Sequence, residues 1–491
     1  MEKETDEFLN KNEIEAGKHN ILGKIEIETS DKIERGRTTF LYLSAVTANL
    51  LMLSCSSGFS WTSPVFTLLK KSNLEENPLG RQLTPLEESL ITSLYCLGAT
   101  AISPFAGKLA DSLGRRRLLL WIAFPKVICL LVLAFATNIW IYYITRFLMG
   151  IVLGIVFTVL PMFLAEISEL HNRGTVGSIM NIFINFGILY IFIIGPFLSV
   201  KALTLCSIIP LLLFIVLFGF FIPESPVFLV SKNRNQQALK ALVKLRGKQQ
   251  SQVQDELGKL SKMIENGRKQ RTNISNIFKD RGLSKGVVIS IMLPLLQQFA
   301  GIYAVLAFMG PIFDASATGL STYVATNLVC TIRVVSTFIT AALMERLGRK
   351  TLLLISSTGT GVSLVFLGLY FYFKNDLEYD MSLFYWLPVT SVITYMVFYN
   401  LGLSGIPFIL PNELFPSHIK ALASSVASFS CFTSSFVVTL IFPVLRESAG
   451  MAVCFWLFLG FTMFGTIYIY IAVPETKGKM PTEVQEYLNN K

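Results

Sequence analysis

The sequence is poor in charge. Only 15% of its 491 residues are Asp, Glu, Lys or Arg, whereas soluble domains carry roughly 25%. Hydrophobic residues make up 52% of the chain, so lipid is the expected solvent for most of its surface. The net charge of +10 would suit nucleic acid only if the cations formed one face of a soluble domain, but they cluster in short loops and one polar segment. The composition therefore indicates a membrane protein whose partner is the lipid bilayer, with no nucleic acid.

The sequence also lacks the groups that disulfide frameworks and enzymes need. All seven cysteines fall inside apolar runs, so no extracellular disulfide is expected. No metal cluster, nucleophile motif or nucleotide-binding loop occurs, and we expect no enzyme activity, metal or cofactor. Residues 1–37 are polar, without an apolar core or a cleavage site, which argues against a signal peptide.

Twelve runs are apolar enough to cross a membrane, which takes about 20 residues for a helix. They are Thr38–Leu69, Ser89–Gly107, Leu118–Ala136, Ile141–Ala165, Thr175–Phe197, Ala202–Ile222, Gly286–Phe313, Thr322–Met344, Thr351–Phe373, Leu383–Leu410, Ala421–Leu445 and Met451–Val473. A polar segment, Ser231–Lys285, separates the first six from the last six. Its helical spacing of apolar residues predicts short amphipathic helices.

Lys and Arg gather in alternate loops, which predicts the orientation of the chain. The basic loops are 108–117, 171–174, 345–350 and 418–420, together with the segment 231–285. The loops between them are poorer in cations or balanced by acids. We therefore expect both termini and the polar linker in the cytoplasm, with the plasma membrane as the default location and a monomer as the functional unit.

The two sets of six runs repeat one another at nearly constant offsets. The matched pairs are Asp111 and Glu345 at 234 residues, Glu166 and Glu413 at 247, and Glu224 and Glu475 at 251. Parallel six-helix halves with a binding site between them are a known carrier architecture. The predicted fold is an all-α integral membrane protein with twelve transmembrane helices in two pseudo-symmetric six-helix bundles. The predicted parts are a tail at 1–37, a half at 38–228, a linker at 229–285, a half at 286–473 and a tail at 474–491.

The charged residues at the cytoplasmic helix ends are duplicated in both halves. They are Asp111, Arg115, Arg116, Glu166, Arg173, Glu224, Glu345, Arg349, Glu413, Lys420 and Glu475. One interpretation is that they only anchor helices and set topology, since an exposed pair contributes about 0–1 kcal/mol. The duplication favours the other interpretation, a cytoplasmic gate.

Ordered motifs across residues 107–478 resemble those of the sugar porter branch of the major facilitator superfamily. They are Gly107–Arg117 (GKLADSLGRRR), Arg146–Gly150 (RFLMG), Glu166 with Arg173-Gly174, Pro223–Pro226 (PESP), Gln297-Gln298, Glu345–Arg349 (ERLGR), Glu413–Pro416 (ELFP) and Pro474–Gly478 (PETKG). Thr62-Ser63-Pro64 is similar to the end of helix 1 in insect trehalose and glucose facilitators. The resemblance implies a sugar carrier, facilitative or proton-coupled, that works by alternating access.

The resemblance also implies a set of sugar-contact positions. They are occupied by Asn181, Gln297, Gln298, Tyr303, Asn400, Phe408, Cys431 and Phe432. Amides suit sugar hydroxyls because they both donate and accept hydrogen bonds. The alternative role for such amides is to hold helices together, at about 0.6 kcal/mol per bond. The chain departs from the family at Tyr303 (usually Asn), Phe408 (usually Trp) and Cys431 (often Asn), which leaves the identity of the sugar open.

Ionisable residues within the runs are few. Arg333 and Lys126 lie inside predicted spans, where charges usually face the protein interior or a wet cavity, and we expect Arg333 to contact substrate. No Asp or Glu occupies the central part of any run, which favours passive transport of trehalose or a hexose. Two alternatives stay open: a carrier of the same fold for another polar solute such as an organic anion, and a non-transporting sugar sensor.

Overall fold

The computed structural model describes residues 38–69, 77–169, 172–269, 281–316, 321–415, 420–477 and 481–490. The predicted N-terminal tail at 1–37 lies outside these ranges, and so do the side chains of Glu345 and Lys420. The regular structure within them is helical throughout. Eleven of the described helical segments are long and apolar enough to cross a membrane.

The first half of the chain forms six crossing segments. Their helices are α2 (Thr39–Ser60) with α3 (Thr62–Leu69), α4 (Pro85–Leu113), α5 (Arg115–Ala134), α6 (Ile139–Ile167), α7 (Arg173–Ile194), and α8 (Val200–Cys206) with α9 (Ile209–Phe221). The predicted second span began at Ser89, but α4 begins four residues earlier because Thr84 and Glu87 form a capping box at its N-terminus.

The second half also forms six. Its helices are α14 (Arg281–Phe299) with α15 (Ile302–Ala307) and α16 (Met309–Ser316), α17 (Thr322–Leu347), α18 (Arg349–Phe371), α19 (Leu387–Leu401) with α20 (Ile406–Leu414), and the long α21 (Lys420–Ala472). Gly450 interrupts α21 with a φ of 87°, so α21 is two helices joined at a sharp bend. The described segments therefore number twelve, as predicted, with the last break at the predicted place.

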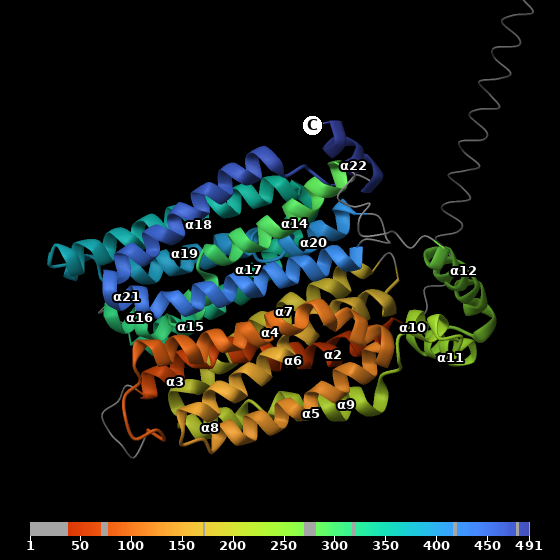
Figure 1. Cartoon of the computed structure of the whole chain (residues 1–491), viewed down its shortest axis with the longest axis horizontal. Coiled ribbons are helices and arrows are strands. Elements are labelled where there is room, and N and C mark those ends of the chain that lie inside the picture. The colour runs from red at the N-terminus through yellow and green to blue at the C-terminus, as the bar shows by residue number, and fades with distance from the viewer. Residues whose placement is uncertain are drawn as a thin grey trace, which may run out of the picture.

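The two halves lie side by side and contact each other along their length (Figure 1). α4 packs against α21, and α7 packs against α17. Many large apolar side chains on the outer surface are exposed, for example Trp121 at 73% and Phe220 at 82%. Exposed apolar surfaces of this extent suit contact with lipid. The buried residues of the two halves form one hydrophobic core.

Several of the crossing segments are interrupted along their length, which hydropathy did not predict. Between α14 and α15 the chain turns at Gly301, whose φ is 92°; a Cβ there would lie 2.4 Å from the Phe458 ring. Another interruption, between α19 and α20, covers Gly402–Gly405, and shorter ones separate α2 from α3 at Trp61 and α8 from α9 at residues 207–208. Irregular backbone at membrane depth is stable where it lines a site or is covered by protein.

The linker contains α10 (Pro226–Ser231), α11 (Asn235–Arg246) and α12 (Gln250–Lys269). α10 begins before the predicted linker at 229–285, and α14 begins inside it, at Arg281. α10, α11 and α12 form a small apolar cluster of their own, at the right-hand end of Figure 1. Arg246 ties the cluster to α6, since its Nη1 donates to the Ile167 carbonyl at 2.7 Å. The C-terminal α22 (Pro481–Asn490) lies at the same end and packs on α14. We call this the charged end and the other, where α3 and α16 lie, the opposite end.

Candidate substrate site and helix-end clusters

Amide side chains gather at the break between α14 and α15. Gln298 Nε2 lies 3.1 Å from Cys431 Sγ and 3.3 Å from Gln297 Oε1. Gln297 Nε2 donates to the carbonyl of Ser404, in the break between α19 and α20, at 3.1 Å. The Gln298 Oε1 atom is buried and has no hydrogen-bond partner, which leaves an acceptor available next to the two breaks.

Aromatic rings from both halves meet in the same region. Tyr303 on α15 stacks on Phe59 of α2, with ring centroids 4.2 Å apart and planes 6° apart. Phe157 on α6 makes edge contacts with Phe408 at 5.1 Å and Phe432 at 5.2 Å. The structure thus brings the three predicted aromatic residues to the interface. Phe59 and Phe157 were not predicted, because nothing distinguishes them from other apolar residues in their runs.

Two of the predicted amides have different surroundings. The Asn400 Nδ2 lies 2.8–3.0 Å from the Arg333 carbonyl and from the hydroxyls of Ser336 and Thr337, so in this structure Asn400 joins α19 to α17. Asn181 of α7 is half-buried, and its Nδ2 lies 3.5 Å from where a Cβ on Gly405 would be. Asn181, the predicted contact residue of the first half, therefore lies next to the break at Gly402–Gly405 in the second half.

Three cations lie buried among the crossing helices. Lys126 is fully buried, and its Nζ lies 3.1 Å from Cys55 Sγ. Arg146 donates to the carbonyls of Ile91 and Gly58 at 2.9 and 2.7 Å. Arg333 is 5% exposed, and its Nε and Nη1 atoms have no hydrogen-bond partner. Of these three, Arg146 entered the sequence interpretation only as part of a motif.

An ion pair joins the halves near the opposite end. Arg446 Nη2 of α21 lies 3.0 Å from Glu88 Oε2 of α4, and their side chains are 15% and 2% exposed. The sequence interpretation had placed both residues in loops. Nearby, Thr62 Oγ1 lies 3.4 Å from the Ala307 carbonyl, and the Gly310 N–H donates to Ser63 Oγ at 2.8 Å. The two halves are in contact at this end.

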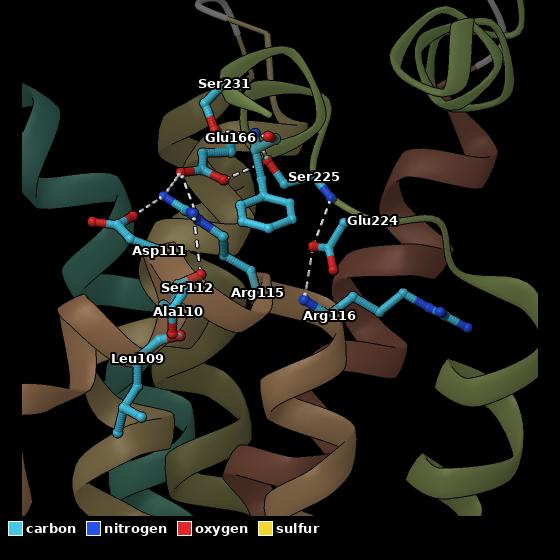
Figure 2. A network of polar contacts seen from close by, with 11 residues as sticks. Leu109, Ala110, Asp111, Ser112, Arg115, Arg116, Glu166, Glu224, Ser225 and Ser231 are labelled. Atoms are coloured by element: carbon cyan, nitrogen blue, oxygen red, sulfur yellow. Dashed lines mark hydrogen bonds and ion pairs between the residues drawn. The ribbon is translucent and has the colours of Figure 1, made fainter. Parts of the chain in front are cut away.

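At the charged end, Arg115 organises a cluster in the first half (Figure 2). Its Nη2 contacts Asp111 Oδ1 at 2.8 Å and Glu166 Oε1 at 3.1 Å. Ser225 donates its hydroxyl hydrogen to the other oxygen of Glu166. Glu224 accepts from the N–H groups of Arg116 and Arg117 at 2.9 and 3.3 Å, and so caps the N-terminus of α5, where the helix dipole favours an anion.

The second half contains the same arrangement. Arg349 Nη2 contacts Glu413 Oε1 at 2.9 Å, and Thr476 Oγ1 donates to Glu413 Oε2. Glu475 caps α18 by accepting from the N–H groups of Arg349 and Lys350 at 2.9 and 3.1 Å. Burial alone would raise the pKa of Glu475, but the backbone N–H groups that donate to it lower that pKa overall.

A glycine makes room for each capping carboxylate. Gly114 and Gly348 precede α5 and α18 with φ values of 98° and 85°. A Cβ would lie 2.6 Å from Glu224 Oε2 at Gly114 and 2.7 Å from Glu475 Oε2 at Gly348. Sequence offsets alone had paired Glu224 with Glu475. In the structure each of them caps the N-terminus of a helix, α5 and α18 respectively.

The ion pairs of Arg115 with Asp111 and Glu166, and of Arg349 with Glu413, each join helices within one half. Arg116 contributes its backbone N–H to Glu224 and its side chain to the Gly219 carbonyl, while Arg173 donates to the Ala165 carbonyl at 3.1 Å. Each cluster therefore stiffens one bundle at its charged end. Their predicted role in closing a cytoplasmic gate stays a prediction.

Comparison with known proteins assigns the chain to a family. The protein-family model described as "Sugar (and other) transporter" matches residues 40–488. The chain belongs to this sugar transporter family. The family's description names transporters, and the repeated clusters of the two halves lie within the matched residues.

Relatives of this family member are insect proteins named "Facilitated trehalose transporter Tret1". The one from Polypedilum vanderplanki is 30% identical, over 94% of this chain and 91% of its own length. That from Bombyx mori is 31% identical, over 92% and 87%. Against the protein from Anopheles gambiae, at 31% identity, the chain spans only 58% of the relative's length, and against that from Drosophila willistoni 50%.

Solved structures show that the fold is that of the major facilitator superfamily. An inward-open form of the xylose transporter XylE from E. coli gives a TM-score of 0.75 over 91% of this chain and 99% of that chain, at 20% identity. The proton:xylose symporter XylE bound to 6-bromo-6-deoxy-D-glucose gives 0.74, over 92% and 99%, at 22% identity. The predicted fold class of this sugar transporter family member is confirmed.

Proposed function

We propose that the chain is a facilitative transporter that carries trehalose or a hexose by alternating access. The observation that carries the proposal is the match of residues 40–488 to the sugar transporter family. The names of the insect relatives, facilitated trehalose transporters, support the substrate.

The site between the halves suits a sugar. Gln297, Gln298 and Asn181 supply amides that can donate to and accept from hydroxyl groups. Tyr303 and Phe408 supply ring faces for the C–H side of a pyranose. These groups lie at the breaks in the crossing helices, where carriers of this general design place their substrates.

The buried charges favour passive transport. Among the described residues, Glu88 is the fully buried acid, and it lies at the opposite end of α4, paired with Arg446. Proton relays in membrane carriers use acidic or histidine side chains inside the membrane. A carboxylate held by an arginine near one helix end does not provide such a relay at the central site.

The orientation in the membrane follows from the distribution of charge. The cations of the charged end favour the cytoplasm for that side, for the linker and for both termini, with the opposite end facing outward. In that orientation the contacts near Glu88 close the outer side, and the carrier opens inward by moving its two rigid halves. The plasma membrane is the proposed location, and a monomer the proposed functional unit.

The test is uptake of labelled trehalose, glucose and fructose by proteoliposomes that contain the full chain. We expect saturable uptake of at least one sugar that a protonophore leaves unchanged. Gln298→Ala should reduce that uptake, whereas Gln249→Ala, on the exposed surface before α12, should not. Uptake of none of the three sugars by a folded protein would refute the proposal.

A further inference from the structure

Arg333 is an arginine without a counter-ion inside the second half. It lies near the middle of the 26-residue α17 and is 5% exposed. Its Nε and Nη1 atoms are buried and have no hydrogen-bond partner. The side chains that interact with it electrostatically are Cys330, Tyr399, Tyr303 and Tyr395, which are uncharged at neutral pH.

The other buried cations of the described chain are all held by acceptors. Arg115 and Arg446 pair with carboxylates, and so does Arg246. Arg146 donates to two backbone carbonyls and lies over the ring of Tyr95, with its Cζ 4.4 Å from the ring centroid. Lys126 contacts the sulfur of Cys55. Arg333 differs from these five because two of its buried donors have no protein acceptor and its side chain makes no hydrogen bond to the described residues, whereas Arg146 has one such donor, its Nη2, beside two bonded ones.

The position of Arg333 connects it with the candidate substrate site. Tyr303, one of its neighbours, stacks on Phe59 of the other half. Asn400 donates to the Arg333 backbone carbonyl, so the arginine lies where α17 meets the end of α19. It therefore belongs to the same layer as the break residues that we assign to sugar binding.

We propose that this site takes a sugar that carries a carboxylate, a hexuronate, and that Arg333 binds the carboxylate. The inference rests on the proposed sugar transport and narrows its substrate class. A buried charge without a partner is costly, and a guanidinium fork matches a carboxylate with two parallel hydrogen bonds. The amides and aromatic rings nearby hold the rest of a pyranose, so the ligand needs both hydroxyls and a negative charge.

The experiment is competition in proteoliposomes. Uptake of labelled glucose by the full-length wild-type protein is inhibited with unlabelled glucose, glucuronate or acetate. Charge-assisted hydrogen bonds to the carboxylate should make glucuronate inhibit at an about tenfold lower concentration than glucose. Acetate, which has the charge without the ring, should inhibit weakly. An inside-positive potential set with potassium and valinomycin should speed the uptake of labelled glucuronate, because each cycle then carries one negative charge inward.

Two variants assign the effect to Arg333. Arg333→Gln keeps hydrogen-bonding capacity but removes the charge, and should abolish the about tenfold advantage of glucuronate over glucose, measured as the ratio of their inhibitory concentrations. Arg333→Lys keeps the charge without the planar fork, and should retain part of the advantage. Glucose uptake by both variants shows at the same time that they are folded.

Each other outcome overturns the inference. Wild-type protein that binds glucuronate no better than glucose has no carboxylate site. An Arg333→Gln variant that loses glucose and glucuronate uptake to the same extent shows a structural arginine. Wild-type protein that moves neither of these sugars, and neither trehalose nor fructose, refutes the proposed transport itself, whereas glucose uptake without a glucuronate preference refutes only the carboxylate site.

Discussion

Arg446 Nη2 and Glu88 Oε2, 3.0 Å apart, join the two halves of the molecule through α21 and α4. Arg446 also has its Cζ 5.8 Å above the centre of the Phe308 ring, at the junction of α15 and α16. Glu88 is almost completely buried. The pair therefore exists only while the two halves are in contact at this end, and the proposed alternating access would break it once in each cycle.

Removing one partner should shift the carrier toward the outward-open state. Arg446→Gln leaves the Glu88 carboxylate buried without its cation, which costs roughly 3–5 kcal/mol for such pairs, and opening returns the carboxylate to water. We expect an increase of at least about tenfold in the reaction of a thiol reagent with a cysteine introduced at the buried Ser63, which the other half covers in this structure.

The charge swap Glu88→Arg with Arg446→Glu provides the matched control. It restores opposite charges across the interface and should return the labelling rate toward that of the parent. Equal labelling in the parent, the single variant and the swap would show that the pair does not control opening.

Gly114→Ala and Gly348→Ala should both destabilise the protein. Each glycine has a φ and ψ that residues with a side chain rarely adopt, at a cost of about 1–3 kcal/mol, and each Cβ would collide with a capping carboxylate. We expect a lower Tm in detergent for both variants. Gly107→Ala in α4 has open space around its Cβ and should leave Tm unchanged or slightly higher. A tolerated Gly114→Ala would contradict the assigned role of Glu224.

The stabilising effect of Glu475 should depend on pH. Its pKa in the folded protein lies below the usual glutamate value of 4.5, so its contribution is complete above that value and declines as the pH falls through the lowered pKa. Glu475→Gln should reduce Tm at pH 7, and the difference should narrow only in acid below pH 4.5. The exposed Glu447→Gln serves as the control, and a difference that is constant with pH would point to packing and not to charge.

Gln298 and Asn400 should respond differently to alanine substitution. Gln298 has an acceptor without a partner, so Gln298→Ala should raise the KM for sugar, with a fall in Tm from the lost contacts of its amide nitrogen. Asn400 joins α19 to α17, so Asn400→Ala should reduce stability by about 1 kcal/mol for each lost bond and leave the KM nearly unchanged. Parallel measurements of uptake and thermal unfolding separate the two roles, and the reverse pattern would exchange them.

Much of the fold was predictable from hydropathy and repetition. Twelve apolar runs gave the twelve crossing segments, and the constant offsets paired Glu224 with Glu475 before any geometry was known. The helix breaks were not predictable in this way, because Gly301 and Gly402 lie inside runs whose mean hydropathy is that of an unbroken helix. At Gly301 the break depends on a positive φ angle and on the close approach of the Phe458 ring. Neither can be read from composition.

The candidate site was predictable only in part. Gln297, Gln298 and Tyr303 came from resemblance to a family. Of these, Tyr303 stacks on Phe59 of the other half, while the contacts of Gln297 and Gln298 lie within the second half. Phe59 and Phe157 carried no signal, since a phenylalanine that faces the partner half looks the same in sequence as one that faces lipid. Glu88 was assigned to a loop because a charge ends an apolar run, although its partner Arg446 allows it to be buried.

The most direct test of facilitated transport is the final level of sugar in proteoliposomes under an imposed pH gradient. Labelled trehalose or glucose should enter until its internal and external concentrations are equal, with the same level whether the exterior is acidic or neutral. Preloading with unlabelled sugar should speed entry of the label, as expected of a carrier that alternates between two sides. Accumulation above the external concentration that requires an acidic exterior would contradict the account, because it would make the protein a proton-coupled carrier.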